Sequence, residues 1–181
     1  MKTHFLFIFF LFLTTLFLLP EAASSSEKHA NRWWKIAFET PMRFSPPRET
    51  GLEAASFLYP PDSGLGKAGM EISIVAVPKE MQEAFAGNDT EILEYVKTTF
   101  LGLSGPAKAK AERTFLGKIC SGESHSSTIP KNTIAEVYLF SLADGDKVAV
   151  GFVRDGAMAE NTAEKIMATA AGSLKEVVVG Q

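Results

Sequence analysis

Short stretches of alternating apolar and polar residues recur along the chain, which is the pattern of half-buried β-strands. The clearest of these, Met70–Val77, has one face that is apolar throughout, and it ends at Pro78. Residues 33–38, Ala54–Tyr59 and residues 112–120 follow a similar pattern and predict three further strands. The chain is therefore expected to build a β-sheet.

Two later alternating runs, residues 134–142 and 147–153, flank the dipeptide Asp144-Gly145. Asp-Gly in this position favours a type I′ turn, because both central residues of that turn need positive φ. The pattern predicts an antiparallel hairpin. Residues 176–179 add either a short edge strand or a packed C-terminal segment.

Two stretches have helical rather than strand periodicity. Asn88 followed by Glu91 is the pattern of a helix N-cap, and it predicts a helix over residues 91–101. Asn161 is the expected cap of a closing helix over residues 163–174. The apolar faces recur at helical spacing: Ile92, Leu93, Val96 and Phe100 in the first helix, and Ala163, Ile166, Met167, Ala170 and Leu174 in the second.

The order of elements is strands, helix, strands and helix, and the hairpin requires antiparallel pairing. This order predicts an α+β fold in which helices pack against an antiparallel sheet, an α/β sandwich. Residues 34–181 contain no internal repeat and no second linker, so they are predicted to form a single domain.

The N-terminus has the layout of a secretory signal peptide. Lys2 and His4 precede an apolar run over residues 5–19, and Ala23-Ser24 offers small residues for cleavage. A membrane-spanning helix needs about 20 apolar residues, and this run is shorter. We expect residues 1–23 to be a cleaved signal peptide, with an uncleaved membrane anchor as the alternative.

Residues 24–33 follow the signal segment, and their first part is small and polar. They are predicted to be a flexible leader ahead of the domain. With the signal peptide removed, the protein is expected to be soluble and extracytoplasmic, either periplasmic or secreted.

Composition narrows the classes of function. A net charge of −3 over 181 residues lacks the basic excess of a nucleic-acid-binding domain. At 46% apolar residues the chain is too hydrophobic for a disordered tail. A single cysteine cannot form an intramolecular disulfide, so the chain is not a disulfide scaffold.

Motifs for cofactors, metals and catalysis are weak. The G-x-G-x-x-G spacing of residues 64–69 leads into a strand, whereas a dinucleotide site opens a helix, so no cofactor is predicted. Glu123 and His125 share one face of a strand while Cys120 points to the other, too few ligands for a structural metal site. Only His29 and His125 remain after signal removal, and no G-x-S-x-G elbow is present, so no catalytic residue is assigned.

Trp33 and Trp34 are the residues with the best prospect of contacting a partner or a membrane surface. Because a strand pattern follows directly, one tryptophan is expected in the core and the other partly exposed. A local basic cluster is expected to be a solvated face, with an anion site as the alternative. It comprises Lys108, Lys110, Arg113 and Lys118.

From residue 34 to residue 178 the order of elements resembles the PsbP-like and DcrB-like α/β sandwich family of exported proteins. The resemblance rests on the strand Met70–Val77, the helix over residues 91–101, the segment RTFLGK at residues 113–118, the hairpin at Asp144-Gly145 and the closing helix. It implies a non-enzymatic accessory or binding role and transfers no site residues.

Two hypotheses follow for function. The first is an exported, non-catalytic binding or assembly-accessory protein of the cell envelope, with a protein or small ligand as its partner. It would not bind nucleic acid and would meet the membrane only through an uncleaved signal segment. The alternative is a small secreted hydrolase that uses carboxylates or His125.

Overall fold

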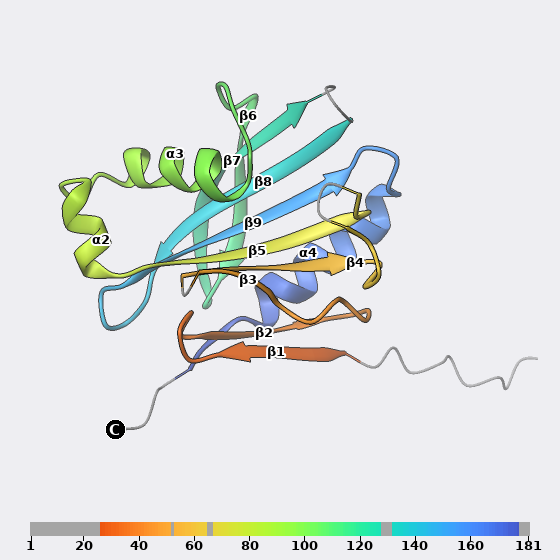
Figure 1. Cartoon of the computed structure of the whole chain (residues 1–181), viewed down its shortest axis with the longest axis horizontal. Helices are drawn as coiled ribbons and strands as arrows, with labels where there is room; N and C mark the ends of the chain where they lie inside the picture. The colour runs from red at the N-terminus through yellow and green to blue at the C-terminus, as the bar shows by residue number, and fades with distance from the viewer. Residues whose placement is uncertain (1–25, 52, 65–66, 128–131, 178–181) are drawn as a thin grey trace, which may run out of the picture.

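The computed structural model describes residues 26–51, 53–64, 67–127 and 132–177 (Figure 1). The predicted signal peptide, residues 1–23, lies outside them. Within the described residues, no helix is both long enough and apolar enough to cross a bilayer.

The described residues form two antiparallel sheets. A small sheet has the order β1-β2-β10, and a large sheet has the order β3-β4-β5-β9-β8-β7-β6. The strands are β1 (Glu27–Asn31), β2 (Ile36–Thr40), β3 (Arg48–Thr50), β4 (Ala54–Tyr59), β5 (Met70–Val77), β6 (Ala109–Phe115), β7 (Lys118–Ser127), β8 (Thr133–Ser141), β9 (Lys147–Asp155) and β10 (Lys175–Glu176). The helices are α2 (Lys79–Ala84), α3 (Asp89–Phe100) and α4 (Glu160–Ser173).

The large sheet is covered on both faces, so the predicted α+β sandwich is confirmed. Helix α3 packs against β5 and β8 on one face, where Val75 and Val77 meet Ile92 and Val96. The small sheet and α4 lie on the other face, and α4 contacts β2 and β6 (Figure 1). The larger apolar core fills the space between α4, the small sheet and this second face.

The closing helix confirms the predicted apolar stripe but not its cap. Side chains of Ala163, Ile166 and Met167 are buried. Helix α4 begins at Glu160, so Asn161 lies inside its first turn, and Ala159 takes the cap position without a side-chain hydrogen bond. The other predicted cap is confirmed: the side chain of Asn88 accepts hydrogen bonds from the first turn of α3.

Two turns differ from the prediction. Residues 112–120 are not one strand, because Leu116 (φ 52°) and Gly117 (φ 75°) form a two-residue turn between β6 and β7. At the predicted hairpin only Gly145 has positive φ, and its N–H donates to the carbonyl of Leu142 at 3.1 Å. That hairpin is confirmed, but its turn is of type I with a glycine bulge, not type I′.

The predicted flexible leader is wrong where the structure describes it. Glu27–Asn31 form β1, which pairs along its whole length with β2. In β1 only the His29 side chain is buried, so no apolar alternation revealed the strand. The first predicted strand starts later than expected, at Ile36, because residues 32–35 form the turn between β1 and β2.

Phe115 stands at the centre of an aromatic cluster under α4. Its ring centroid lies 5.1 Å from that of Tyr138, 4.9 Å from that of Phe140 and 6.5 Å from that of Phe152. The side chain is fully buried, whereas Ile119, on the other arm of the same hairpin, is 76% exposed.

We expect Phe115→Ala to lower the free energy of unfolding by about 3–5 kcal/mol, because it leaves a cavity among rings that cannot collapse onto it. Ile119→Ala is the matched control and should change stability by less than about 0.5 kcal/mol. Urea unfolding followed by tryptophan fluorescence measures both. Equal effects of the two substitutions would contradict this assignment of the core.

Candidate functional site

The turn between β1 and β2 places the two tryptophans in different surroundings. Trp34 is 2% exposed and meets the ring of Phe57 edge-on, with centroids 5.6 Å apart. Trp33 is 50% exposed, and the Arg32 guanidinium lies 4.9 Å from its ring centroid. This matches the expectation that one tryptophan is core and the other accessible. A partner for Trp33 remains a prediction, and buried Trp34 can only support its neighbour.

Trp33 and Trp34 line a cavity of about 440 Å³ that we name the hairpin groove. The turn between β1 and β2, the start of α2 and the turn between β8 and β9 meet at this groove. Its apolar lining is Trp33, Trp34, Ala76, Pro78, Leu142 and Val148, and its charged lining is Lys35, Glu53, Lys79, Glu80, Asp146 and Lys147.

Lys35 ties two sides of the hairpin groove together. Its ammonium donates to Asp144 Oδ2 at 2.6 Å and also to Asp146. Asp146 in turn accepts from the backbone N–H of Lys79 at the start of α2, at 3.2 Å. The hydrogen bonds to Asp144 and Asp146 raise the pKa of Lys35, and the same contact lowers the pKa of Asp144. The groove is thus bounded by segments that hold each other in place.

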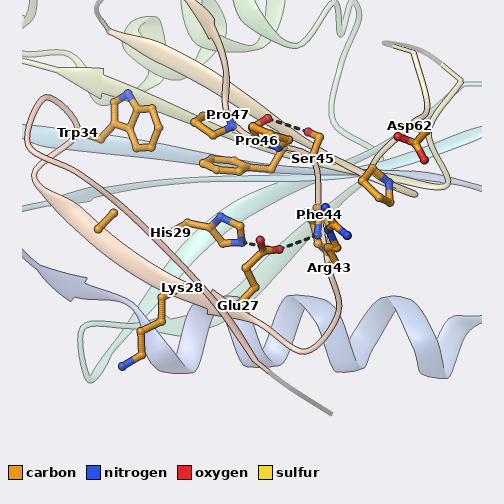
Figure 2. A pocket seen from close by; sticks show the side chains of 13 residues that line it. Glu27, Lys28, His29, Trp34, Arg43, Phe44, Ser45, Pro46, Pro47 and Asp62 are labelled. Carbon is orange, nitrogen blue, oxygen red and sulfur yellow. Dashed lines mark hydrogen bonds and ion pairs between the residues drawn. The ribbon is translucent and has the colours of Figure 1, made fainter.

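A second cavity of about 440 Å³, the His29 pocket, opens on the other side of Trp34 (Figure 2). Strand β1 forms one wall, the loop from β2 to β3 forms another, and the rings of Phe57 and Trp34 complete the lining. The residues that line it are Glu27, Lys28, His29, Ala30, Trp34, Arg43, Phe44, Ser45, Pro46, Pro47, Phe57, Pro61 and Asp62.

His29 is held in this pocket by one defined hydrogen bond. Thr40 Oγ1 donates to the carbonyl of Met42 at 2.8 Å, so it accepts from His29 Nε2–H, 3.1 Å away. The imidazole also packs against the rings of Phe57 and Phe38, at centroid distances of 4.7 and 5.0 Å. Burial lowers the pKa of His29, and the carboxylate of Glu27 opposes this only in part.

The carboxylate of Glu27 fixes the loop opposite. Its Oε2 accepts from the backbone N–H of Phe44 at 3.0 Å and lies 4.0 Å from His29 Nε2 (Figure 2). Glu27 and His29 are two residues apart on a strand and therefore share a face. That spacing is the one sequence signal that could have pointed to this pocket, which the sequence analysis missed.

Glu123 and His125 do meet, but beneath α3 and away from both cavities. Glu123 Oε2 lies 3.1 Å from His125 Nε2 and 2.7 Å from the ammonium of Lys97, which also contacts Glu94. The run of Ser, Gly and Thr residues around His125 is typical of a solvent-facing segment, yet the His125 side chain is buried. Burial would lower the pKa of Lys97 and raise that of Glu123. The contacts of Lys97 with Glu123 and Glu94 together outweigh burial, so the pKa of Lys97 is raised. The hydrogen bonds of Glu123 with Lys97 and His125 likewise lower the pKa of Glu123.

The predicted basic cluster is split by the structure. Lys108, Lys110 and Lys118 are exposed, whereas Arg113 turns inward beneath α4. Its guanidinium bonds Glu164 of α4 and Glu136 of β8 at 2.9 and 3.1 Å, and Tyr138 donates to the same Glu136 oxygen. Arg113 therefore joins α4 to the sheet and is not part of a solvated basic face.

The remaining motifs are not assembled into a site in the described part of the chain. Cys120 is a partly buried free thiol, and burial raises its pKa. No group of three or more His, Cys, Asp or Glu side chains among the described residues could hold a metal ion. Residues 64–69 connect β4 to β5, as expected, and two of them lie outside the described residues.

Comparison with known proteins identifies the fold. No protein-family model matches the chain, and no curated protein matches it in sequence. The Ran-binding protein Mog1p of Saccharomyces cerevisiae shares the fold at a TM-score of 0.55 and 11% identity, over 85% of this chain and 96% of Mog1p. Cyanobacterial PsbP (CyanoP) of Synechocystis gives a TM-score of 0.53 and 13% identity, over 87% of this chain and 95% of that protein.

A third similar structure comes from Bacteroides thetaiotaomicron, at a TM-score of 0.50 and 12% identity. The match covers 86% of this chain but spans only half the length of that protein. The similarity to PsbP that the order of elements predicted is confirmed at the level of the fold. Identities this low carry no site from one protein to another.

The position of His29 predicts a pH-dependent stability. Its pKa lies below 6.5 in the folded state, so the unfolded chain takes up the proton first as the pH falls. Stability should therefore be fully present above about pH 6.5 and decline as the pH falls toward the folded-state pKa.

We expect His29→Gln, which keeps a donor for Thr40, to remove this part of the pH dependence. Urea midpoints at about pH 7.5 and about pH 5 compare the two proteins. A wild type and variant with identical pH dependence would contradict the role assigned to His29.

Proposed function

We propose that the chain is an exported, non-catalytic binding or assembly-accessory protein of the cell envelope. Its contact surface for a protein partner is the hairpin groove, with Trp33 as the anchor. The observation that carries this proposal is the half-exposed indole of Trp33 on a turn whose two sides are fixed.

Trp33 has the properties of an interface anchor. Tryptophan is enriched among the residues that dominate binding energy, because its large ring loses much apolar surface to water on association. The turn that carries it is held by buried Trp34 on one side and by the ion pairs of Lys35 on the other. Little conformational freedom is then lost on binding, which favours affinity.

Two further observations support binding rather than catalysis. Under α3, Glu123 is hydrogen-bonded to both Lys97 and His125, and neither Glu123 nor His125 lines the hairpin groove or the His29 pocket. A fold shared with Mog1p, a Ran-binding protein, supports a protein-binding role by analogy of fold alone.

Export rests on the N-terminal sequence. The basic, apolar and small-residue order of residues 1–23 directs a chain into the secretory route and ends in a cleavage site. An envelope location, periplasmic or secreted, agrees with this segment.

Trp33→Ala should weaken capture of the partner at least about ten-fold while leaving the unfolding midpoint nearly unchanged. A pull-down from the native envelope fraction identifies the partner, and its Kd is then measured with purified proteins. Ile119→Ala, which removes an exposed side chain elsewhere, is the matched control and should leave the Kd unchanged.

A Kd for the partner that Trp33→Ala leaves unchanged would contradict the assignment of the hairpin groove as the contact surface. A measured function that His125→Ala abolishes, with stability intact, would instead favour the small secreted hydrolase that uses carboxylates or His125.

Processing has a separate test. Mass spectrometry of protein from the native host should find a new N-terminus between Ala22 and Ser26. Full-length protein held in the membrane fraction would contradict cleavage and favour an uncleaved anchor.

A further inference from the structure

The His29 pocket presents hydrogen-bond acceptors along the wall formed by β1. Glu27 is 41% exposed by side chain, and its Oε1 has no hydrogen-bond partner among the described residues. His29 gives its Nε2–H to Thr40, so its other ring nitrogen, Nδ1, carries a lone pair. A ligand that meets this wall must therefore supply donors.

Apart from the exposed Arg43, the facing wall is poor in donors. Pro46, Pro47 and Pro61 line the pocket, and proline has no backbone N–H. The hydroxyl of Ser45 donates to the carbonyl of Pro46 at 2.9 Å and accepts from the N–H of Leu58, so it is already occupied. These groups offer apolar contact and carbonyl oxygens, and nothing that would bind an anion.

The net charge at the centre of the pocket is negative. The ammonium of Lys28 points away from the cavity, where it is 80% exposed and pairs with Glu39 at 3.7 Å (Figure 2). Arg43 and Asp62 are both exposed lining residues of opposite charge, so together they add no net charge to the lining. The carboxylate of Glu27, beside the neutral imidazole of His29, is then the charge that a ligand meets.

We propose that the His29 pocket binds a small organic amine. The ammonium group lies against Glu27 and donates to its free oxygen, and the apolar body lies between the prolines and the aromatic rings of Phe57 and Trp34. A cavity of about 440 Å³ suits a molecule with a single ring, within the usual range of small-ligand sites. The lining of this site shares only Trp34 with that of the hairpin groove, so its test does not depend on the proposed function.

Three probes of one shape test the charge requirement on the full chain. Phenethylamine carries the ammonium, 2-phenylethanol is its neutral counterpart, and phenylacetate is the anion. Isothermal titration calorimetry should find the amine bound at least about ten-fold more tightly than the alcohol, with no binding of the acid. Equal affinity for all three probes, or no heat with the amine, would overturn the proposal.

Glu27→Gln tests the residue that makes the distinction. The amide keeps an oxygen that can accept from the N–H of Phe44, so the loop stays in place while the charge is lost. Amine affinity should fall at least about ten-fold and alcohol affinity should not change.

Glu112→Gln is the matched control, because it makes the same chemical change at an exposed position of β6 that lines neither cavity. Its amine affinity should stay within about two-fold of the wild type, as should that of Trp33→Ala. Amine affinity unaffected by Glu27→Gln, or reduced equally by Glu112→Gln, would overturn the assignment of Glu27. Trp33→Ala that weakens amine binding would overturn the separation of the two sites.

Discussion

The burial of Trp34 between the small sheet and the large sheet is the contact on which both cavities depend. Trp34 lines the hairpin groove on one side and the His29 pocket on the other. Burying a large aromatic side chain contributes about 2–3 kcal/mol, whereas an ion pair as exposed as that of Lys35 contributes about 0–1 kcal/mol. Packing therefore places the turn, and the ion pairs with Asp144 and Asp146 select its detailed conformation.

The two faces of the large sheet differ in what covers them, and both cavities lie on the side of the small sheet. Under α3, Lys97 and Glu123 form an ion pair, so neither charge is left unpaired in a largely apolar setting. Neither residue lines the hairpin groove or the His29 pocket. On the other face, Arg113 holds α4 against the sheet through Glu164 and Glu136. With α4 covering that end, the small sheet covers the rest of the face, and both cavities form around its first hairpin.

Local patterns in the sequence predicted the elements whose signals are themselves local. Met70–Val77 and Ala54–Tyr59 match their predicted bounds, because apolar side chains mark them and prolines or turn residues end them. The turn at Leu116-Gly117 was missed, since a leucine with positive φ is uncommon and the apolar run continues across it. The His29 pocket is lined by β1, the loop before β3 and residues in and after β4. A local sequence pattern cannot predict that segments so far apart in the chain lie together.

Strand β1 was not predicted from the sequence, and it forms a wall of the His29 pocket and one arm of the turn that carries Trp33 and Trp34. Ordering each residue costs about 1–2 kcal/mol of backbone entropy, and EKHAN buries only one side chain in return. Backbone pairing with β2 and the contacts of His29 must offset that cost. Because β1 buries so little apolar surface, its other positions are occupied by polar groups such as Glu27. Those groups do little for the core and give the pocket its chemical character, so binding at this site and stability of the large sheet rest on largely separate residues.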